Sequence, residues 1–522
     1  MSEIILASKF DGLFADYTAA YAPSISGDGR FIVFAAETED ARGSLEREIL
    51  LYDTSNDTLE IISVKQNGTP MDGHAYDPMI SDDGQFIVYM NDKYLPSEGD
   101  SNILADVFLH DINSSVTTIL SNGITGTFIF NAASYPSISG NGEEVVFVSG
   151  ENTLASNDKN TNSDVFRYDA NFGTVEALST TESALTVAAY GNSYHPEISS
   201  SGDFVAYVSY RSDLVPNDTN QIADVFLYSS ATGQTSLVSG NVKLGNGYQF
   251  YGKAVVSADG QHIAYVATDS IFTGLGTLNN VQIILHNSKF NTDILIFGPN
   301  SIDRSGASNN DFNIKPDISD NGAFVVYHSS NPNIVAGDNN GFTDIFVYNA
   351  ATDQTAIVSV NALGEQANAD SVHPSISADG KYITFQTYAY NMHSGDTDAF
   401  ADILRVANPL FGSAGWYYGW TSGWHVGWVN GWHESWNYSW FYGWSINWHT
   451  SWHVGWHVGW NVGWHFANGG WSNGWFYGWA NGWNYGWTIG WTVGWAIGWN
   501  YGWVYGWHIG WANGWHTDWL LN

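Results

Sequence analysis

The chain has 522 residues, with 52 acidic against 16 basic side chains and a formal net charge of −36 at pH 7. This charge excludes a general nucleic-acid binder, because phosphate contacts need clustered Lys and Arg, and it opposes attraction to anionic lipid. The absence of cysteine excludes disulfides, thiolate metal sites and cysteine nucleophiles.

The N-terminal segment, residues 1–20, has no basic region followed by a long apolar run, so we do not expect a conventional signal peptide. No window approaches the roughly 18 uninterrupted apolar residues of a spanning helix, so we expect no transmembrane span. The ending, residues 516–522 (HTDWLLN), is compatible with a C-terminal secretion signal. All 26 tryptophans lie after residue 415, which divides the chain into two parts of different composition.

The first part repeats seven times. Its repeated phrase reads PSISGDGRFIVF at residues 23–34 and returns at 78–89, 136–147, 196–207, 254–265, 316–327 and 374–385. The aligned glycines are separated by 55 to 62 residues and are Gly29, Gly84, Gly142, Gly202, Gly260, Gly322 and Gly380. The Ser-x-Asp/Asn-Gly step predicts a tight turn between two strands, because Gly tolerates a positive φ.

Each repeat predicts four strands. After the turn comes a second apolar run, such as DVFLY at 224–228, then a polar turn and a short final strand. Four-stranded units repeated radially make a β-propeller. The seventh repeat stops after its third strand (401–406), and residues 4–8 (IILAS) resemble the missing one. Pairing the two ends in one blade would remove an open sheet edge. We therefore predict an all-β protein with a seven-bladed β-propeller over residues 1–408, closed by the N-terminal strand 4–8.

These repeats resemble the TolB-type, WD-like propeller repeats of many bacterial extracellular and periplasmic proteins. The resemblance covers about three quarters of the chain and rests on the turn-and-strand phrase quoted above. It implies the propeller fold and leaves function open, because propellers host many activities.

An acidic pattern, Asp-x-Asn/Asp-x-x-x-Asp, precedes the third strand in five of the seven repeats. The candidate residues are Asp100, Asn102 and Asp106; Asp158, Asn160 and Asp164; Asp218, Asn220 and Asp224; Asp338, Asn340 and Asp344; and Asp396, Asp398 and Asp402. Their alternating oxygen side chains resemble calcium-loop spacing, so calcium is the one cofactor that we consider. The competing interpretation is structural, since Asp and Asn also bond their own backbone in turns. No bidentate Glu accompanies the pattern, and both interpretations stay open.

The second part, residues 415–522, is a Gly-Trp-x-x array that follows a short linker, 409–414. Its two arms, 415–464 and 471–519, each hold thirteen tryptophans at every fourth position, separated by HFANGG. On an α-helix a glycine every turn would cost about 1 kcal/mol each, so we predict a repetitive β domain. With period two, Trp and the apolar residue share one face. Representatives of that aromatic face are Trp416, Trp444, Trp464, Trp471, Trp495 and Trp519.

The array carries no Lys or Arg and only Glu434 and Asp518 as acidic groups, so little opposes self-association. No metalloprotease, P-loop or dinucleotide motif is present. We expect a non-enzymatic extracellular or surface protein for structural or protein–protein interaction, whose tail binds another copy, another protein or a glycan. The alternative is a carbohydrate-binding protein that uses the Trp array as a sugar platform.

Overall fold

The computed structural model describes residues 4–411 except 11, 40–42, 66, 96–99, 101–102, 122–131, 161, 181–190, 221, 242–252, 269–280, 298–314 and 397. It also describes the backbone of residues 461–465 and 473–474. The chain divides into two units, Met1–Asn408 and Pro409–Asn522. No helix in the described ranges has the length and hydropathy needed to cross a membrane.

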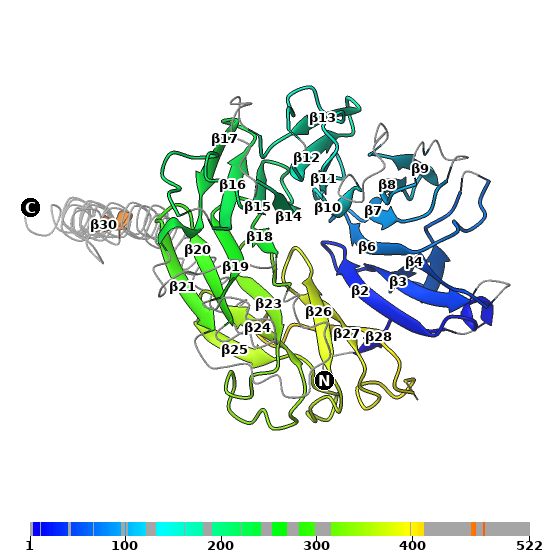
Figure 1. The fold of residues 1–522 in the computed structure, drawn as a ribbon. Helices are drawn as coiled ribbons and strands as arrows, with labels where there is room; N and C mark the ends of the chain where they lie inside the picture. Colours follow the sequence, from blue (N-terminus) through cyan, green and yellow to red (C-terminus); the bar gives the residue numbers. More distant parts are fainter. Residues whose placement is uncertain are drawn as a thin grey trace, which may run out of the picture. The chain divides into compact units, whose positions relative to one another are not determined.

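The first unit is a seven-bladed β-propeller (Figure 1). Blade 1 holds β2 (Ala19–Ile25), β3 (Phe31–Glu39), β4 (Leu45–Asp53) and β5 (Thr58–Ile61). Blade 2 holds β6 (Ala75–Ile80), β7 (Phe86–Asn91), β8 (Asp106–Asp111) and β9 (Val116–Ile119). Blade 3 holds β10 (Ser134–Ile138), β11 (Glu144–Ser149), β12 (Asp164–Asp169) and β13 (Thr174–Ala177). Blade 4 holds β14 (Ser193–Ile198), β15 (Phe204–Ser209), β16 (Asp224–Ser229) and β17 (Gln234–Leu237).

Blade 5 holds β18 (Ala254–Val256), β19 (His262–Thr268), β20 (Val281–Asn287) and β21 (Thr292–Phe297). Blade 6 holds β22 (Asp317–Ile318), β23 (Phe324–Ser329), β24 (Asp344–Asn349) and β25 (Gln354–Ile357). Blade 7 holds β26 (Ser371–Ile376), β27 (Tyr382–Thr387), β28 (Asp402–Ala407) and β1 (Ile5–Leu6). Within the described residues, the short 3₁₀ helices Gly12–Phe14 and Ser239–Asn241 lie between strands.

Each blade is antiparallel, and the first strand of every repeat lies innermost, beside the first strands of both neighbouring blades. The wheel is closed by β1, which pairs with β28 in the register Ile5↔Arg405 and Leu6↔Leu404. The Ala7 N–H extends this pairing by donating to the Ile403 carbonyl at 2.8 Å. The N-terminus therefore supplies the outer strand of the last blade.

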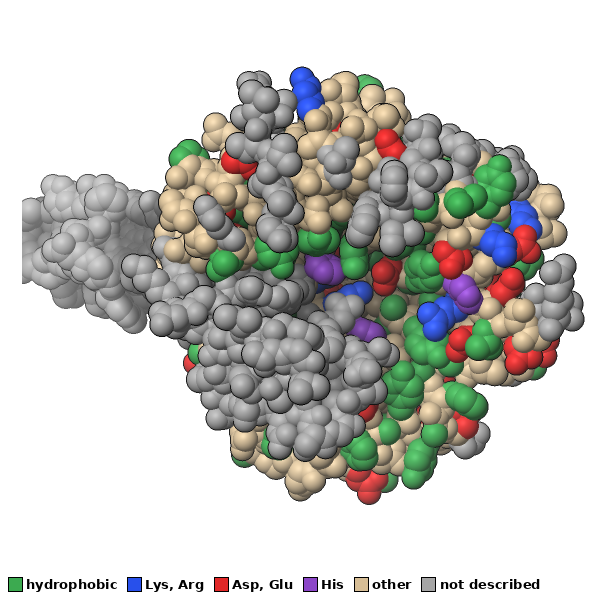
Figure 2. Space-filling model, viewed as in Figure 1, with side chains coloured by type: hydrophobic (Ala, Val, Ile, Leu, Met, Phe, Trp, Pro, Cys, Tyr) green, Lys and Arg blue, Asp and Glu red, His purple; other side chains and the backbone are tan. Residues whose placement is uncertain are grey.

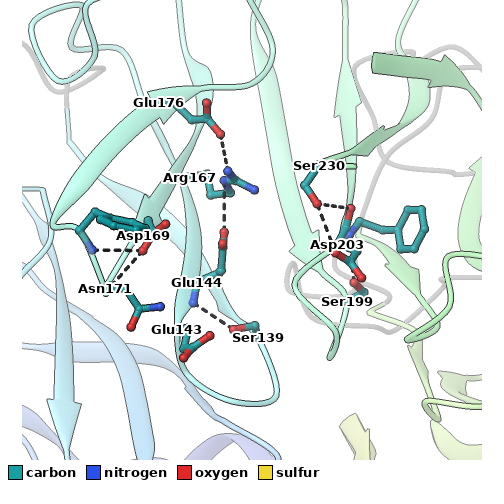
Figure 3. A network of polar contacts seen from close by, with 12 residues as sticks. Ser139, Glu143, Glu144, Arg167, Asp169, Asn171, Glu176, Ser199, Asp203 and Ser230 are labelled. Carbon is teal, nitrogen blue, oxygen red and sulfur yellow. Dashed lines mark hydrogen bonds and ion pairs between the residues drawn. The ribbon is translucent and has the colours of Figure 1, made fainter. Parts of the chain in front are cut away.

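The turn after each inner strand is built by its serine. In blade 3 the Ser139 hydroxyl accepts the N–H of Glu144 at 3.0 Å, across the turn that contains Gly142 (Figure 3). The same bond recurs at 3.0 to 3.1 Å in the other blades, from Ser26, Ser81, Ser199, Ser257, Ser319 and Ser377. The Ser-x-Asp/Asn-Gly phrase thus fixes the hairpin between the first two strands, as the sequence predicts.

Stacked rings from the second and third strands lie in the cores of blades 2, 3, 4 and 6. Tyr89 stacks on Phe108 in blade 2 at a centroid distance of 5.6 Å, and Tyr207 stacks on Phe226 in blade 4 at 5.8 Å. Both tyrosines are fully buried. Such pairs contribute about 0.5–1.5 kcal/mol beyond the burial of their area, so they hold the two central strands of a blade together.

In the second unit the structure describes β29 (Asn461–His465) and β30 (Asn473–Gly474), which pair antiparallel beside the HFANGG segment. Trp464 lies within β29. Trp416, Trp444, Trp471, Trp495 and Trp519 lie outside the described residues, as does most of the two arms.

Candidate functional site

The last aspartate of each acidic loop has a structural partner that the sequence analysis missed. A serine beyond the fourth strand donates its hydroxyl to that carboxylate and accepts the next backbone N–H at 2.9 to 3.1 Å. The pairs are Asp106 with Ser121, Asp164 with Ser179, Asp224 with Ser239, Asp344 with Ser359, and Asp402 with Ser8. The serine follows its aspartate by 15 residues in four of these pairs, so the signal was present in the repeat.

The middle asparagine bridges two carboxylates in blade 3. The Asn160 amide donates to Asp158 Oδ1 at 3.0 Å and to Asp164 Oδ2 at 2.7 Å. In blade 6 the Asn340 amide donates to Asp344 Oδ2 at 2.7 Å. An amide thus lies between the two carboxylates in blade 3, and in blade 6 it donates to Asp344 and to the Ala367 carbonyl, which supports the structural interpretation in both loops.

The remaining two Asn-containing loops lie in blades 4 and 2. In blade 4 the Asn220 N–H donates to Asp218 Oδ1 at 3.3 Å, and Asp218 Oδ2 is buried without a hydrogen-bond partner among the described residues. In blade 2 Asn102 lies outside the described residues, while Asp100 Oδ2 accepts the Leu95 N–H at 2.8 Å. These two loops give no gathered set of carboxylates within the described part of the chain.

Blade 7 differs because Asp398 stands where the other loops have asparagine. Oxygens of Asp396, Asp398 and Asp402 all lie within 4.8 Å of one another. Asp396 Oδ1 accepts the Asp398 N–H at 3.2 Å, and Asp398 Oδ1 accepts the Phe400 N–H at 2.9 Å. Three carboxylates replace two carboxylates and an amide, so like charges gather at the point where the wheel closes.

The pKa values of the loop aspartates reflect their surroundings. Burial and the charges of Asp396 and Asp398 raise the pKa of Asp402 to about 7, against the lowering effect of the Ser8 hydrogen bond. Burial likewise raises the pKa values of Asp164, Asp224 and Asp344 to about 6. Ionising these groups therefore costs free energy, which a bound cation would offset. Carboxylate oxygens are suitable ligands for calcium. The three carboxylates of the blade 7 loop fit a calcium ion best among the five loops.

A second candidate site lies on the axis of the wheel. One residue from each repeat, just before the position of the repeat proline, lines a cavity of about 100 Å³: Ala22, Asp77, Tyr135, His195, Lys253, Lys315 and His373. Figure 2 shows histidine, basic and acidic side chains gathered in the hollow at the middle of the propeller. This position directly precedes the repeat phrase and holds Ala, Asp, Tyr, His or Lys in the different repeats, a signal that sequence analysis left unused.

The backbone is strained around this axial pocket. Five of these residues have positive φ: Ala22 at 49°, Asp77 at 47°, Tyr135 at 54°, His195 at 49° and His373 at 51°. In each case the pairing with the second strand shifts register at this point. Non-glycine residues in this region are strained, and such residues cluster at ligand sites.

Each lysine of the pocket wall lies near a carboxylate. Lys253 Nζ lies 2.5 Å from Glu197 Oε2, and Lys315 Nζ lies 3.5 Å from Asp77 Oδ1. Burial, together with the positive charges of Lys315 and Lys253, lowers the pKa of His195 to about 4. Burial and Lys315 also lower the pKa of His373. Both imidazoles are therefore neutral at pH 7.

The turns that follow the inner strands contact one another between blades. The Gly27 N–H donates to the Asp82 carbonyl at 3.0 Å, and the Gly140 N–H donates to the Ser200 carbonyl at 2.9 Å. The Ser200 hydroxyl donates to the Asp82 carboxylate, and a Cβ at Gly140 would lie 2.5 Å from both side chains. These contacts link the turns of blades 1 to 4 with one another.

No protein-family model and no curated protein sequence matches the chain. Among solved structures it is similar to an oligogalacturonate lyase from Vibrio parahaemolyticus, with 13% identity and a TM-score of 0.45 over 78% of this chain and 97% of that one. It is also similar to TolB from Acinetobacter baumannii, with 13% identity and a TM-score of 0.35 over 73% and 81% of the two chains.

A third similar structure is the β-propeller domain of the Trilobed protease from Pyrococcus furiosus, with 9% identity and a TM-score of 0.42 over 71% and 89% of the two chains. At these identities the likeness concerns the propeller fold alone.

Proposed function

We propose that the protein is a non-enzymatic interaction protein of the cell exterior or cell surface. Its propeller is a calcium-stabilised head, and its Gly-Trp-x-x array mediates self-association or anchoring. The observation that carries the calcium assignment is the carboxylate cluster of Asp396, Asp398 and Asp402, whose oxygens lie within 4.8 Å of one another. In blade 3 an asparagine amide bridges the two loop carboxylates, so the proposal assigns calcium to blade 7.

Calcium in blade 7 would act on the closure of the wheel. Asp402 begins β28, and its carboxylate accepts the Ser8 hydroxyl from the segment that follows β1. A cation bound to Asp402 would relieve the repulsion from Asp396 and Asp398. Since anything that binds only the folded state stabilises it, calcium would hold the N-terminal strand in place.

The composition of residues 415–522 supports the assembly role of the tail. Twenty-six tryptophans accompany two acidic side chains and no Lys or Arg. Burying one tryptophan contributes up to about 5 kcal/mol, and little electrostatic repulsion opposes contact between copies. The same aromatic face could stack on sugar rings, which is the alternative function.

The two roles of the tail are distinguished by comparing the full chain with residues 1–408. Sedimentation velocity gives the association state, and a glycan array gives carbohydrate binding. Assembly of the full chain alone, without glycan binding, supports the interaction role. A monomeric full chain whose Trp fluorescence is quenched by a saccharide would contradict self-association and favour the sugar platform.

A further inference from the structure

We propose that the axial pocket binds a small aliphatic carboxylate, whose acid group pairs with the Lys315 ammonium and whose carbon chain lies along the ring of prolines. This inference is independent of the proposed roles of calcium and the tail. All seven repeats contribute a residue to the pocket wall at one level of the axis.

Most charges of the pocket wall are satisfied within the protein. Lys253 lies 2.5 Å from Glu197. The two Asp317 carboxylate oxygens accept the N–H groups of Ile318 and Ile376, both at 2.9 Å. These groups are therefore already paired within the propeller.

Lys315 is the basic group with the weaker partner. Its Nζ lies 3.5 Å from Asp77 Oδ1, whereas a good charge-assisted bond between an ammonium and a carboxylate measures about 2.7–2.9 Å. The Lys315 side chain keeps 25% of its accessible surface and the Asp77 side chain keeps 34%. An incoming ligand can therefore reach both side chains. A ligand carboxylate can approach Lys315 more closely than Asp77 does.

Neutral imidazoles flank this lysine. His373 Nδ1 lies 3.2 Å from Gln386 Oε1, and the same oxygen accepts the Ala22 N–H at 3.4 Å. His195 packs on the Tyr135 ring at a centroid distance of 4.3 Å. Both histidines thus lie in fixed contacts, and neither adds a negative charge that would repel an anion.

Prolines of the repeat phrase make up most of the remaining wall, which also includes Ser24 and Ser375. Pro23, Pro78, Pro136, Pro196, Pro316 and Pro374 follow the lining residues around the ring, with Met79 between them in blade 2. A pocket of about 100 Å³ holds roughly eight water-sized positions, which is room for a short-chain acid. Small-molecule sites commonly combine an apolar wall with a few polar groups in this way.

The test uses the full chain and isothermal titration with butyrate, its neutral amide butyramide, and inorganic phosphate. We expect saturable butyrate binding, at least about tenfold weaker binding of butyramide, and no competition by phosphate. Lys315→Gln should weaken butyrate binding at least about tenfold, since it removes the ionic partner. Asp77→Asn should strengthen it several-fold, because the internal competitor for Lys315 loses its charge.

The matched control is Lys381→Gln, which removes an exposed lysine paired with Asp379 outside the pocket. It should leave butyrate binding unchanged. Equal binding of butyramide and butyrate, competition by phosphate at equal strength, or unchanged binding in Lys315→Gln would overturn the proposal. If Lys315→Gln fails to fold, the direction of the change in Asp77→Asn decides: weaker or unchanged binding contradicts a site at Lys315.

Discussion

The ring of Tyr382 in blade 7 lies directly over Gly29 in blade 1, so that a Cβ added at Gly29 would overlap the ring. The contact repeats around the wheel: a Cβ at Gly84 would lie 2.6 Å from the Phe31 ring, and one at Gly380 would lie 2.6 Å from the Phe324 ring. The turn glycine therefore serves two purposes, a left-handed backbone and space for the ring of the preceding blade. At Gly29 the contact joins the last blade to the first.

Substitution Gly29→Ala should destabilise the propeller by about 3 kcal/mol. Its φ of 76° costs an alanine roughly 1 kcal/mol, and displacing the Tyr382 ring costs about 1–3 kcal/mol more. Gly364→Ala is the matched control, because Gly364 has a φ of 83° but no atom within 4 Å of an added Cβ. Urea denaturation of the two variants compares them. Equal losses of stability would mean that the ring contact contributes nothing.

Replacing Ser8 by alanine should weaken the closure of the wheel. The Ser8 hydroxyl donates to Asp402 and accepts the Ile403 N–H at 3.0 Å. Its loss leaves both groups without this partner, at a cost of about 2–3 kcal/mol. Hydrogen exchange of the Ala7 amide, which bonds to Ile403, should accelerate. Ser114→Ala, which removes an exposed serine–aspartate bond in blade 2, should change little. Unchanged exchange at Ala7 would show that the closure does not depend on this serine.

The raised pKa of Asp402 predicts a pH effect of definite sign. The carboxyl has a pKa of about 7 in the folded protein against 3.8 as a model group, so between pH 4 and 7 the folded state binds more protons than the unfolded state. The free energy of unfolding contributed by this group then falls as the pH rises.

Asp402→Asn isolates that contribution from other titrating groups. With calcium chelated, we expect its stability relative to the unmodified protein to increase by about 1–2 kcal/mol from pH 5 to pH 8, after allowance for solvent screening. Urea denaturation at the two pH values measures the change. A difference that stays constant, or shrinks, between pH 5 and pH 8 would contradict the raised pKa.

Much of the propeller could be predicted from the sequence because its strongest constraints are local. The step from Ser26 through Gly29 fixes a turn within six residues, and its sevenfold repetition indicates the number of blades. The closure of the last blade by the N-terminal strand, seen in the pairing of Ile5 with Arg405, could also be predicted, because the seventh repeat lacks its fourth strand.

The axial pocket could not be predicted in this way. Lys315 and Asp77 belong to blades 6 and 2 and approach each other only once the wheel is closed. The acidic loops illustrate the same limit, because Asn160 and Asp398 are equivalent in the sequence pattern. Only the structure shows an amide bridging two carboxylates in one loop and three carboxylates together in the other.

Replacing one carboxylate oxygen of Asp398 by an amide nitrogen tests the proposed calcium site most directly. Asp398→Asn gives blade 7 the amide found in blade 3, so it should raise the melting temperature of the full chain without calcium. Calcium should raise the melting temperature of the unmodified protein by at least a few degrees and leave that of Asp398→Asn unchanged. An equal calcium-induced rise in both proteins, or none in either, would contradict a calcium site in the closing blade.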